Sequence, residues 1–258
     1  MDMIDPFYVI SGLVVGLLVG QTGVGGGALM TPLLVLVFGL NPAIAVGTDL
    51  LYASATKSVG ALVHGYNRTV DWQVVRRLAI GSVPASLATL AMMALWNTAE
   101  HSSRAISVVL GVVLLLTAAS LLYRRAFLNL VAPILAQVTQ RGTAALTIGV
   151  GATLGVLVTF TSVGAGALGA TALLLLYPRT RMAVIVGSDI AHAVPLTLVA
   201  GLGHLAMGAV NWALLLALLC GSVPGIILGS HMAARVPEHI VRWVMAAVLL
   251  VVGSRLVM

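Results

Sequence analysis

Charged side chains are scarce in this sequence, where they make up 8% of 258 residues while hydrophobic residues make up 60%. A soluble domain usually carries about a quarter charged residues, because it needs a surface that water can wet. The polar side chains here are too few to cover a globule of this size. This composition excludes an ordinary soluble domain and indicates that lipid is the main surrounding solvent.

Cysteine is almost absent as well, since Cys220 is the only one. A single cysteine excludes an internal disulfide and a cysteine-based metal cluster. No histidine arrangement has metal-ligand spacing, and the sequence nominates no nucleophile–base pair. We therefore expect no metal, no cofactor and no enzyme activity.

Acidic residues are few, and the formal net charge is +6. The basic residues are dispersed among the connectors between apolar runs, which in membrane proteins reports topology instead of nucleic-acid binding. When the connectors are placed on alternating sides, one side receives most of the arginines, and such an excess marks the cytoplasmic side. We predict no nucleic-acid partner and a multi-pass protein of the inner (cytoplasmic) membrane, embedded in the lipid bilayer with both termini outside.

Long apolar runs recur along the whole sequence, and residues 108–123 carry no charge at all. A membrane-spanning helix needs roughly 20 apolar residues. We predict an all-α polytopic protein of about ten helical segments, several of them shorter than that, with residues 1–258 forming a single membrane domain. The expected segments are residues 7–21, 26–38, 44–65, 74–96, 103–123, 143–159, 165–177, 182–205, 212–234 and 240–257.

The two halves of the sequence resemble each other at a spacing of about 140 residues. Residues 22–29 (TGVGGGAL) match residues 161–168 (TSVGAGAL), and residues 81–84 (GSVP) match residues 221–224 (GSVP). Further matched pairs are Gly47 with Gly187, Asp49 with Asp189, His64 with His204, and Trp72 with Trp212. We predict one repeat over about residues 7–123 and a second over about residues 142–258.

Five segments in each repeat would start the second repeat on the opposite side of the membrane from the first. The repeats would then have inverted topology, an arrangement common among secondary transporters, whose substrate site lies near the midplane between the repeats. A repeat of four segments would instead make them parallel, which the distribution of arginines disfavours.

Glycine-rich runs at residues 23–27 and 162–166 break the first helix pair of each half. Matching breaks indicate a transport site, because a helix that begins after a break exposes unpaired N–H groups and the positive end of its dipole to an anion. The candidate binding residues are Thr22, Gly23, Gly25, Gly26, Gly27, Thr161, Ser162, Gly164 and Gly166. The alternative is close helix packing. We prefer it for the glycines spaced by four residues, which are Gly12, Gly16, Gly20, Gly221, Gly225 and Gly229.

Ionisable residues also fall inside two matching apolar segments. They are Asp49, Lys57 and His64 in the first half, and Asp189, His192 and His204 in the second. A charge near the bilayer centre costs roughly 2.5–3.5 kcal/mol on insertion scales, so such residues normally face a cavity or a partner. The aspartates are either helix-end charges or ion-coupling groups. The histidines are candidates for proton coupling, and those near segment ends could instead be interfacial.

Lys57 is the only lysine in the sequence and lies more than two turns from either end of its segment. At that depth its side chain cannot easily reach water. Its partner is either an aspartate, which would make it structural, or an anionic substrate. Thr197 occupies the matching position of the second half, so the positive charge has no counterpart there.

Several of these motifs together resemble the TauE/SafE family, membrane proteins described as sulfite exporters or organosulfur-linked permeases. The motifs are residues 23–34 (GVGGGALMTPLL), 45–50 (AVGTDL), His64, residues 70–72 (VDW) and 81–84 (GSVP). The resemblance covers essentially the whole chain. It implies transport of small anions such as sulfite, sulfoacetate or related sulfur compounds, with export favoured. It carries over no binding residue, so the site candidates rest on the physical argument alone.

The sequence thus predicts a secondary transporter for a small anion, sulfite or another sulfur-containing anion such as an organosulfonate, coupled to protons or to the membrane potential. A passive anion channel could use the same broken helices. An intramembrane enzyme would need a pair of acids such as Asp49 and Asp189. A non-transporting scaffold explains neither the duplicated breaks nor the deep lysine. The faces of small residues are compatible with a homodimer.

Overall fold

The computed structural model describes residues 6–22, 27–95, 99–123, 126, 130–131, 138–232 and 238–257. The regular structure of these residues is entirely helical, which confirms the prediction of an all-α protein with about ten segments. The helices are α1 (Pro6–Thr22), α2 (Gly27–Leu36), α3 (Pro42–Tyr66), α4 (Trp72–Leu95), α5 (Ala99–Leu122), α7 (Gln140–Thr161), α8 (Ala167–Leu176), α9 (Met182–Ala206), α10 (Trp212–Met232) and α11 (Glu238–Val257).

Local sequence signals set several of the helix ends. The side chain of Asn41 accepts a hydrogen bond from the N–H of Ala43 and caps α3, whose first residue is Pro42. Thr139 caps α7 by accepting from the N–H of Gly142. These are the residue types that favour helix starts, because a side-chain oxygen satisfies one of the exposed N–H groups.

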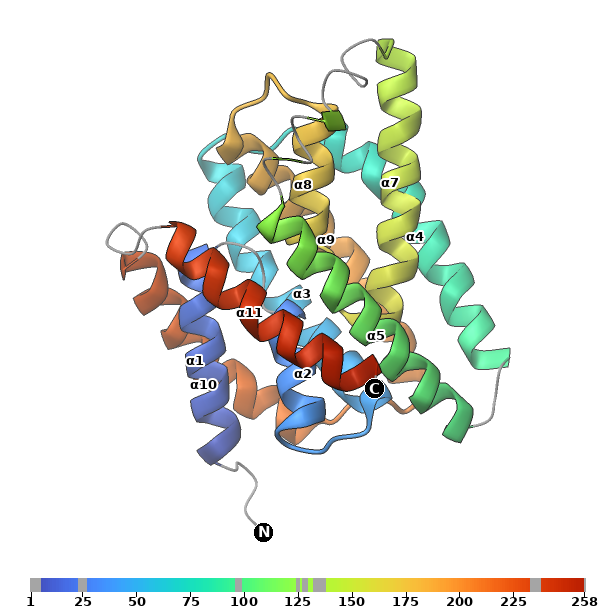
Figure 1. Ribbon diagram of the computed structural model, residues 1–258, viewed down its shortest axis with the longest axis vertical. Coiled ribbons are helices and arrows are strands. Elements are labelled where there is room, and N and C mark those ends of the chain that lie inside the picture. The colour runs from blue at the N-terminus through green and yellow to red at the C-terminus, as the bar shows by residue number, and fades with distance from the viewer. Residues whose placement is uncertain are drawn as a thin grey trace.

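Four pairs of helices carry most of the packing, and each pair joins the first half of the chain to the second. The pairs are α1 with α10, α4 with α7, α3 with α9, and α5 with α11. In Figure 1 the α1–α10 and α4–α7 pairs lie on opposite sides of the molecule, with α3 and α9 between them and α5 and α11 crossing in front. The two halves are therefore interleaved along their whole length.

Close contact between α1 and α10 depends on glycine. A Cβ atom added at Gly12 or Gly16 would meet the backbone of α10, and one added at Gly221, Gly225 or Gly229 would meet the backbone of α1. The prediction that these glycines serve helix packing is confirmed, whereas Gly20 lies outside the part of the chain whose packing is described.

The α4–α7 pair is built in the same way. A Cβ at Gly81 would meet the backbone of α7, and one at Gly151 or Gly155 would meet the backbone of α4. Small residues let backbones approach closely, which is how helices gain packing energy in a lipid environment.

The central helices α3 and α9 run antiparallel. Gly47, near the start of α3, packs against His204 at the end of α9, and Gly187, near the start of α9, packs against His64 at the end of α3. In both cases a Cβ on the glycine would collide with the facing chain. The two helices that carry the candidate ionisable residues therefore contact each other along their length.

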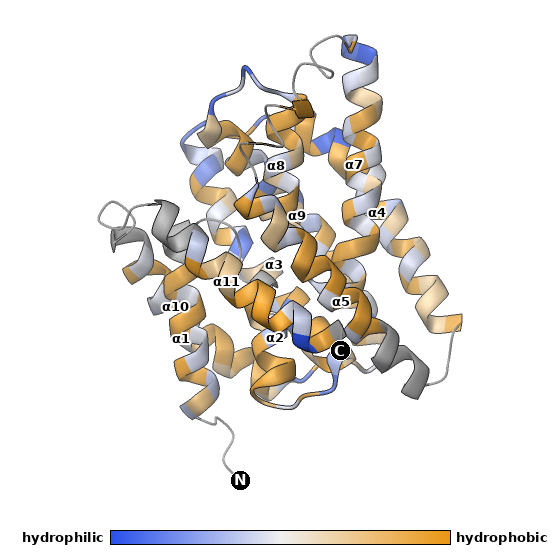
Figure 2. Cartoon of the chain, in the orientation of Figure 1, coloured by the Kyte–Doolittle hydropathy of each residue, from blue (hydrophilic) through white to orange (hydrophobic). Residues whose placement is uncertain are grey.

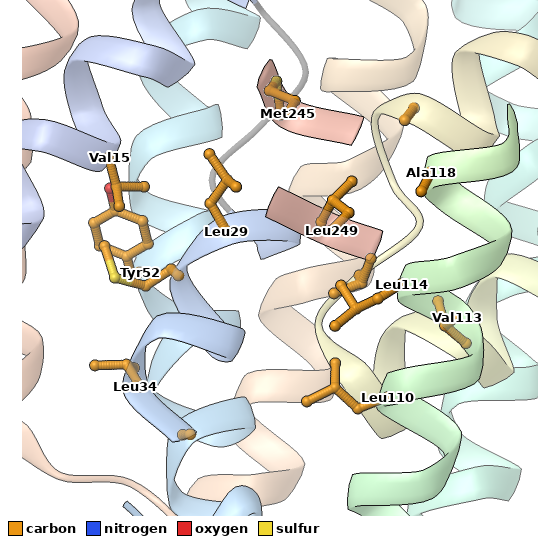
Figure 3. Close-up of a cluster of buried hydrophobic side chains, with 14 of the residues drawn as sticks. Val15, Leu29, Leu34, Tyr52, Leu110, Val113, Leu114, Ala118, Met245 and Leu249 are labelled. Atoms are coloured by element: carbon orange, nitrogen blue, oxygen red, sulfur yellow. The ribbon is translucent and has the colours of Figure 1, made fainter. Parts of the chain in front are cut away.

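A large apolar cluster joins α1, α2, α3, α5 and α11. Figure 3 shows Tyr52 of α3 beside Val15 and Leu29, with Leu114 of α5 and Leu249 of α11 completing the cluster. This core holds the outer helices against α2 and α3.

The outer surface is apolar as well. Leu62 is 75% exposed and Val37 is 72% exposed, as expected of side chains that face lipid. Hydrophobic residues dominate the helices in Figure 2, whereas the hydrophilic ones gather mainly toward the helix ends and connectors. Among the described helices, α4, α7, α9 and α10 are long and apolar enough to cross a membrane by length and composition.

Candidate functional site

Five side chains of the Asp, Lys and His types are buried inside the helical bundle in the described part of the chain. The buried set in the described part of the chain comprises Asp49, Lys57, Asp189, His192 and His204, none of which is more than 7% exposed. Charged residues are almost never fully buried unless they are paired, so this set needs a structural or functional explanation. Four of its members are linked by electrostatic interactions with Lys57. We call these four residues, Asp49, Lys57, Asp189 and His192, the central cluster.

Lys57 connects the central cluster to the segment between α7 and α8. Its Nζ atom donates a hydrogen bond of 2.9 Å to the carbonyl oxygen of Ala165. The carboxyl groups of Asp189 and Asp49 act on its charge through space, and Asp189 does so more strongly. The ammonium group thus contacts the segment that leads into α8 and lies within electrostatic range of both aspartates.

Asp49 is held by the neighbouring helix α2. The hydroxyl of Thr31 donates a hydrogen bond to Oδ2 of Asp49. The hydroxyl of Ser162 lies near the same carboxyl group. However, neither Asp49 Oδ1 nor Ser162 Oγ has a hydrogen-bond partner. The Ser162 hydroxyl is close enough to act on this carboxyl group as a donor, and a buried carboxylate oxygen without a closer partner is a place where a proton can bind.

Asp189 faces the start of α8. The N–H of Gly166 lies within hydrogen-bonding range of its carboxyl group. A Cβ at Gly169 would collide with the same carboxyl group, so glycine is required there for the close approach. Oδ1 of Asp189 has no partner although the side chain is only 2% exposed.

The segment between α7 and α8 has a backbone that favours glycine. Gly164 and Gly166 have φ angles of 123° and 130°, and Ser162 adopts the left-handed conformation with φ 59°. Gly166 precedes α8 without a side-chain cap. In the first turn of α8 the N–H of Gly169 donates to the carbonyl oxygen of Gly164, and no side chain caps the N–H groups before it, which lie at the positive end of the helix dipole.

Thr161 shapes this segment from within. Its hydroxyl donates to the carbonyl oxygen of Leu157 at 2.6 Å and accepts from the N–H of Val163 at 3.1 Å. The hydroxyl of Thr161 thus forms its hydrogen bonds with the neighbouring backbone. The hydroxyl of the next candidate, Ser162, has no close hydrogen-bond partner.

His192 lies one turn after Asp189 and contacts α4. Its Nε2 is 2.8 Å from the hydroxyl of Ser82, and its Nδ1 has no partner. Tyr52 of α3 stands at the matching position (192 minus 52 is 140) and is also fully buried with an unpartnered hydroxyl. Sequence reasoning missed Tyr52, Ser82 and Thr31, and the 140-residue spacing was the signal that could have found Tyr52.

His64 and His204 lie apart from the central cluster, at the two ends of the α3–α9 contact. Nδ1 of His64 is 2.8 Å from the hydroxyl of Thr69, and His64 is half-buried. Nε2 of His204 donates to the carbonyl oxygen of Thr159 at 3.0 Å, and its side chain is fully buried. Both histidines therefore pack at helix ends, where they contact the glycine that begins the opposite helix.

Two further hydrogen bonds form in matching positions at the two ends of the α3–α9 contact. The hydroxyl of Ser188, just before Asp189, accepts from the N–H of Asp71 at 2.8 Å. The hydroxyl of Thr48, just before Asp49, accepts from the N–H of Asn211 at 3.0 Å. Each contact links the start of α3 or α9 to the connector that precedes α10 or α4.

The first glycine-rich run can be placed only at its borders. Thr22 ends α1 and Gly27 begins α2, whereas Gly23, Gly25 and Gly26 lie outside the described residues. The part that these three glycines play beside the central cluster therefore stays a prediction.

The central cluster combines one ammonium group, two carboxyl groups and an imidazole with the uncapped start of a helix. Carboxyl groups and imidazole can carry protons, while the ammonium group and helix N–H groups attract anions. Among the described residues no group of three or more His, Cys, Asp or Glu side chains could hold a metal ion. The groups of this site can therefore bind protons and small anions.

Comparisons with known proteins agree with a membrane transporter. The family model described as sulfite exporter TauE/SafE matches residues 8–256. The "Probable membrane transporter protein YjnA" of Bacillus subtilis is 40% identical over 251 residues, covering 96% of this chain and 98% of the relative. The "Probable membrane transporter protein YunE" of the same organism is 26% identical, covering 96% of each chain. No solved structure matches the chain.

These matches settle the class of protein. They span nearly the whole chain, and the family and both relatives are transporters, which confirms that the protein is multi-pass and is not an enzyme. The chain belongs to the TauE/SafE family of membrane transporters.

Proposed function

We propose that the protein exports a small sulfur-containing anion, such as sulfite, across the cytoplasmic membrane, and that the anion binds between Lys57 and the start of α8. The observation that carries this proposal is the buried ammonium group of Lys57, which lies against an uncapped helix start. An anion placed there would receive charge-assisted hydrogen bonds together with the favourable end of the helix dipole.

Further donors support an anion at this place. The hydroxyl of Ser162 is buried without a close partner, and Gly164 and Gly166, which adopt positive φ angles, carry no side chain that would cover their backbone. A small tetrahedral or pyramidal oxyanion needs several such donors around it, because each oxygen accepts hydrogen bonds. The equivalent residues of the first half, Thr22 and Gly23–Gly27, would form the matching part of the site.

The proposed transport cycle uses two inverted repeats, residues 7–123 and 142–258, with glycine-broken first helix pairs. The antiparallel packing of α3 and α9, which carry matching sequences, supports this arrangement. So do the reciprocal hydrogen bonds of Thr48 and Ser188 at its two ends. Rocking of one repeat against the other would open the central cluster to each side in turn. The arginine-rich connectors would lie inside and both termini outside.

The driving force would come from the membrane potential or from protons. A negative cell interior favours anion export by about 2.3 kcal/mol per charge for each 100 mV. The unpartnered carboxylate oxygens of Asp49 and Asp189 are the proposed proton-binding atoms, with His64, His192 and His204 as further groups that can exchange protons.

Flux of radiolabelled sulfite in proteoliposomes tests this function. Vesicles containing the purified protein should accumulate sulfite against its gradient when a pH gradient or a potential is imposed, and protein-free vesicles should not. Flux that only equilibrates would indicate a passive channel. Absence of sulfite flux in both directions would refute sulfite as the substrate, and a panel of organosulfonates would then be assayed in the same vesicles.

A further inference from the structure

The carboxyl group of Asp189 lies where the proposed anion would bind. It approaches the N–H of Gly166 at the start of α8, and it packs directly on Gly169 in the first turn of that helix. It also interacts with Lys57 more strongly than Asp49 does. A carboxylate is itself a small oxyanion, so Asp189 makes the contacts that a transported anion would need.

Asp49 differs from Asp189 in its surroundings. Its Oδ2 accepts the hydroxyl hydrogen bond of Thr31 from α2, so one oxygen is satisfied by a side chain outside the α8 start. Asp189 accepts no such side-chain hydrogen bond among the described residues, and its donors are the backbone at Gly166 and the charge of Lys57. The two aspartates match in sequence, yet Asp189 lies against the start of α8 whereas Asp49 lies beside Thr31 and Ser162.

We propose that the carboxylate of Asp189 competes with the transported anion for the charge of Lys57 and for the start of α8. The carboxylate keeps this place until it takes up a proton, and the anion then replaces it. This inference rests on the proposed function and names the group that couples anion binding to protons. Of the two driving forces considered there it selects the proton, so export of a singly charged anion would follow the combined gradients of the anion and its proton and not the membrane potential. The proton comes from water and binds to a carboxylate oxygen of Asp189, and no bond of the anion changes. A proton and a singly charged anion together leave the net charge of the central cluster unchanged.

The charge balance favours this exchange. A third negative charge beside Asp49 and Asp189 would oppose one ammonium group with three anions, which is costly away from water. The other ionisable groups near Asp189 are His192 on its own helix, together with Lys57 and Asp49 from α3. The buried polar residues that α4, α7 and α8 contribute in the described part of the chain are hydroxyl residues, such as Ser82, Thr161 and Thr171. Asp189 is therefore the carboxyl group whose protonation frees the cation.

Binding of radiolabelled sulfite to the purified full-length chain in nanodiscs tests the proposal. In the wild type, one linked proton weakens binding about tenfold for each pH unit above the titration of the carboxyl group. Asp189→Asn imitates the protonated side chain, so it should bind sulfite with an affinity that lacks this dependence. Asp49→Asn should keep it. The titration of sulfite itself affects all variants equally at a given pH, so the difference between them isolates the protein.

A matched control is available at the half-buried start of α4. Asp71→Asn also removes one carboxylate, but from the start of α4, where its Oδ1 accepts from the N–H of Gln73 and asparagine caps equally well. This variant should show the wild-type pH dependence. The proposal is overturned if Asp189→Asn keeps the wild-type pH dependence, or if Asp49→Asn loses it instead.

A measurement on the wild type alone keeps the proposal testable if a variant fails to fold. A pH-sensitive dye trapped in proteoliposomes should report one proton moving in the same direction as each singly charged anion, and an imposed potential should then leave that flux unchanged. Anion flux without proton movement would overturn the competitor role while leaving the proposed transport intact. Absence of any sulfite flux would instead count against the proposed function.

Discussion

Replacing Lys57 by methionine is the most informative single substitution in this protein. Methionine keeps an unbranched side chain of similar length, so the packing of α3 against α9 should change little. The substitution removes the ammonium group that donates to Ala165 and that is acted on by Asp49 and Asp189. It therefore tests the charge of Lys57 separately from its bulk.

The size of the effect follows from Coulomb's law. Two unit charges about 4 Å apart attract by about 4 kcal/mol at an effective dielectric constant of about 20, which corresponds to about a thousandfold in binding. The carboxyl groups of Asp49 and Asp189 already offset part of the positive charge. We therefore expect kcat/KM for sulfite to fall by about a hundredfold to a thousandfold in Lys57→Met.

Exchange of radiolabelled for unlabelled sulfite across proteoliposomes is the appropriate assay, because it needs no imposed gradient. The control is Thr197→Ala at the matching position of α9, where the hydroxyl bonds only to carbonyl groups of its own helix. This control should exchange sulfite at the wild-type rate. Flux should be compared at equal amounts of monodisperse protein.

A binding role for the charge would be refuted if Lys57→Met exchanged sulfite within a factor of about three of the wild type, since this is far below the effect of a unit charge at contact distance. Lys57 would then be a structural partner of the aspartates, and the anion site would have to lie elsewhere. Equal losses in Lys57→Met and Thr197→Ala would indicate damage to the α3–α9 contact instead of loss of a binding charge.

Three predictions concern the packing around the site and use thermal unfolding in detergent or hydrogen exchange. Gly81→Val should destabilise the protein by about 1–3 kcal/mol, because the valine side chain would collide with the α7 backbone. Gly149→Ala, whose side chain would enter open space on α7, should not destabilise it. Equal unfolding temperatures of these two variants would contradict the close packing. Ser82→Ala should lower the free energy of unfolding by about 1–3 kcal/mol, because it leaves Nε2 of His192 without a partner. An unchanged unfolding temperature would argue against that hydrogen bond. Thr48→Val should speed amide exchange at the connector before α10, and unchanged protection would show that the hydroxyl does not hold it.

The helices were predictable because each long apolar run ends at a connector with turn or capping residues. Asn41 and Pro42 begin α3 as their residue types favour, and every observed end lies within four residues of the expected one. Glycines spaced by four residues also predicted close packing. Which helix each glycine face meets was not predictable, because a face of small residues fits many partners equally well.

The candidate site was predictable only where burial has a high energetic cost. Lys57 and the two aspartates stood out because a charge in an apolar segment needs an explanation. Ser82 and Thr31 did not, because a hydroxyl in a membrane helix commonly satisfies itself on its own backbone, as Thr56 does here. Their roles follow from which helices come together, and this information is absent from any single segment.

A structure of the purified protein with sulfite bound tests the central claim most directly. We predict the anion beside Nζ of Lys57 and the first turn of α8, with the carboxyl group of Asp189 displaced from that turn. Sulfite bound away from Lys57 and α8, with Asp189 still packed on Gly169, would contradict this mechanism.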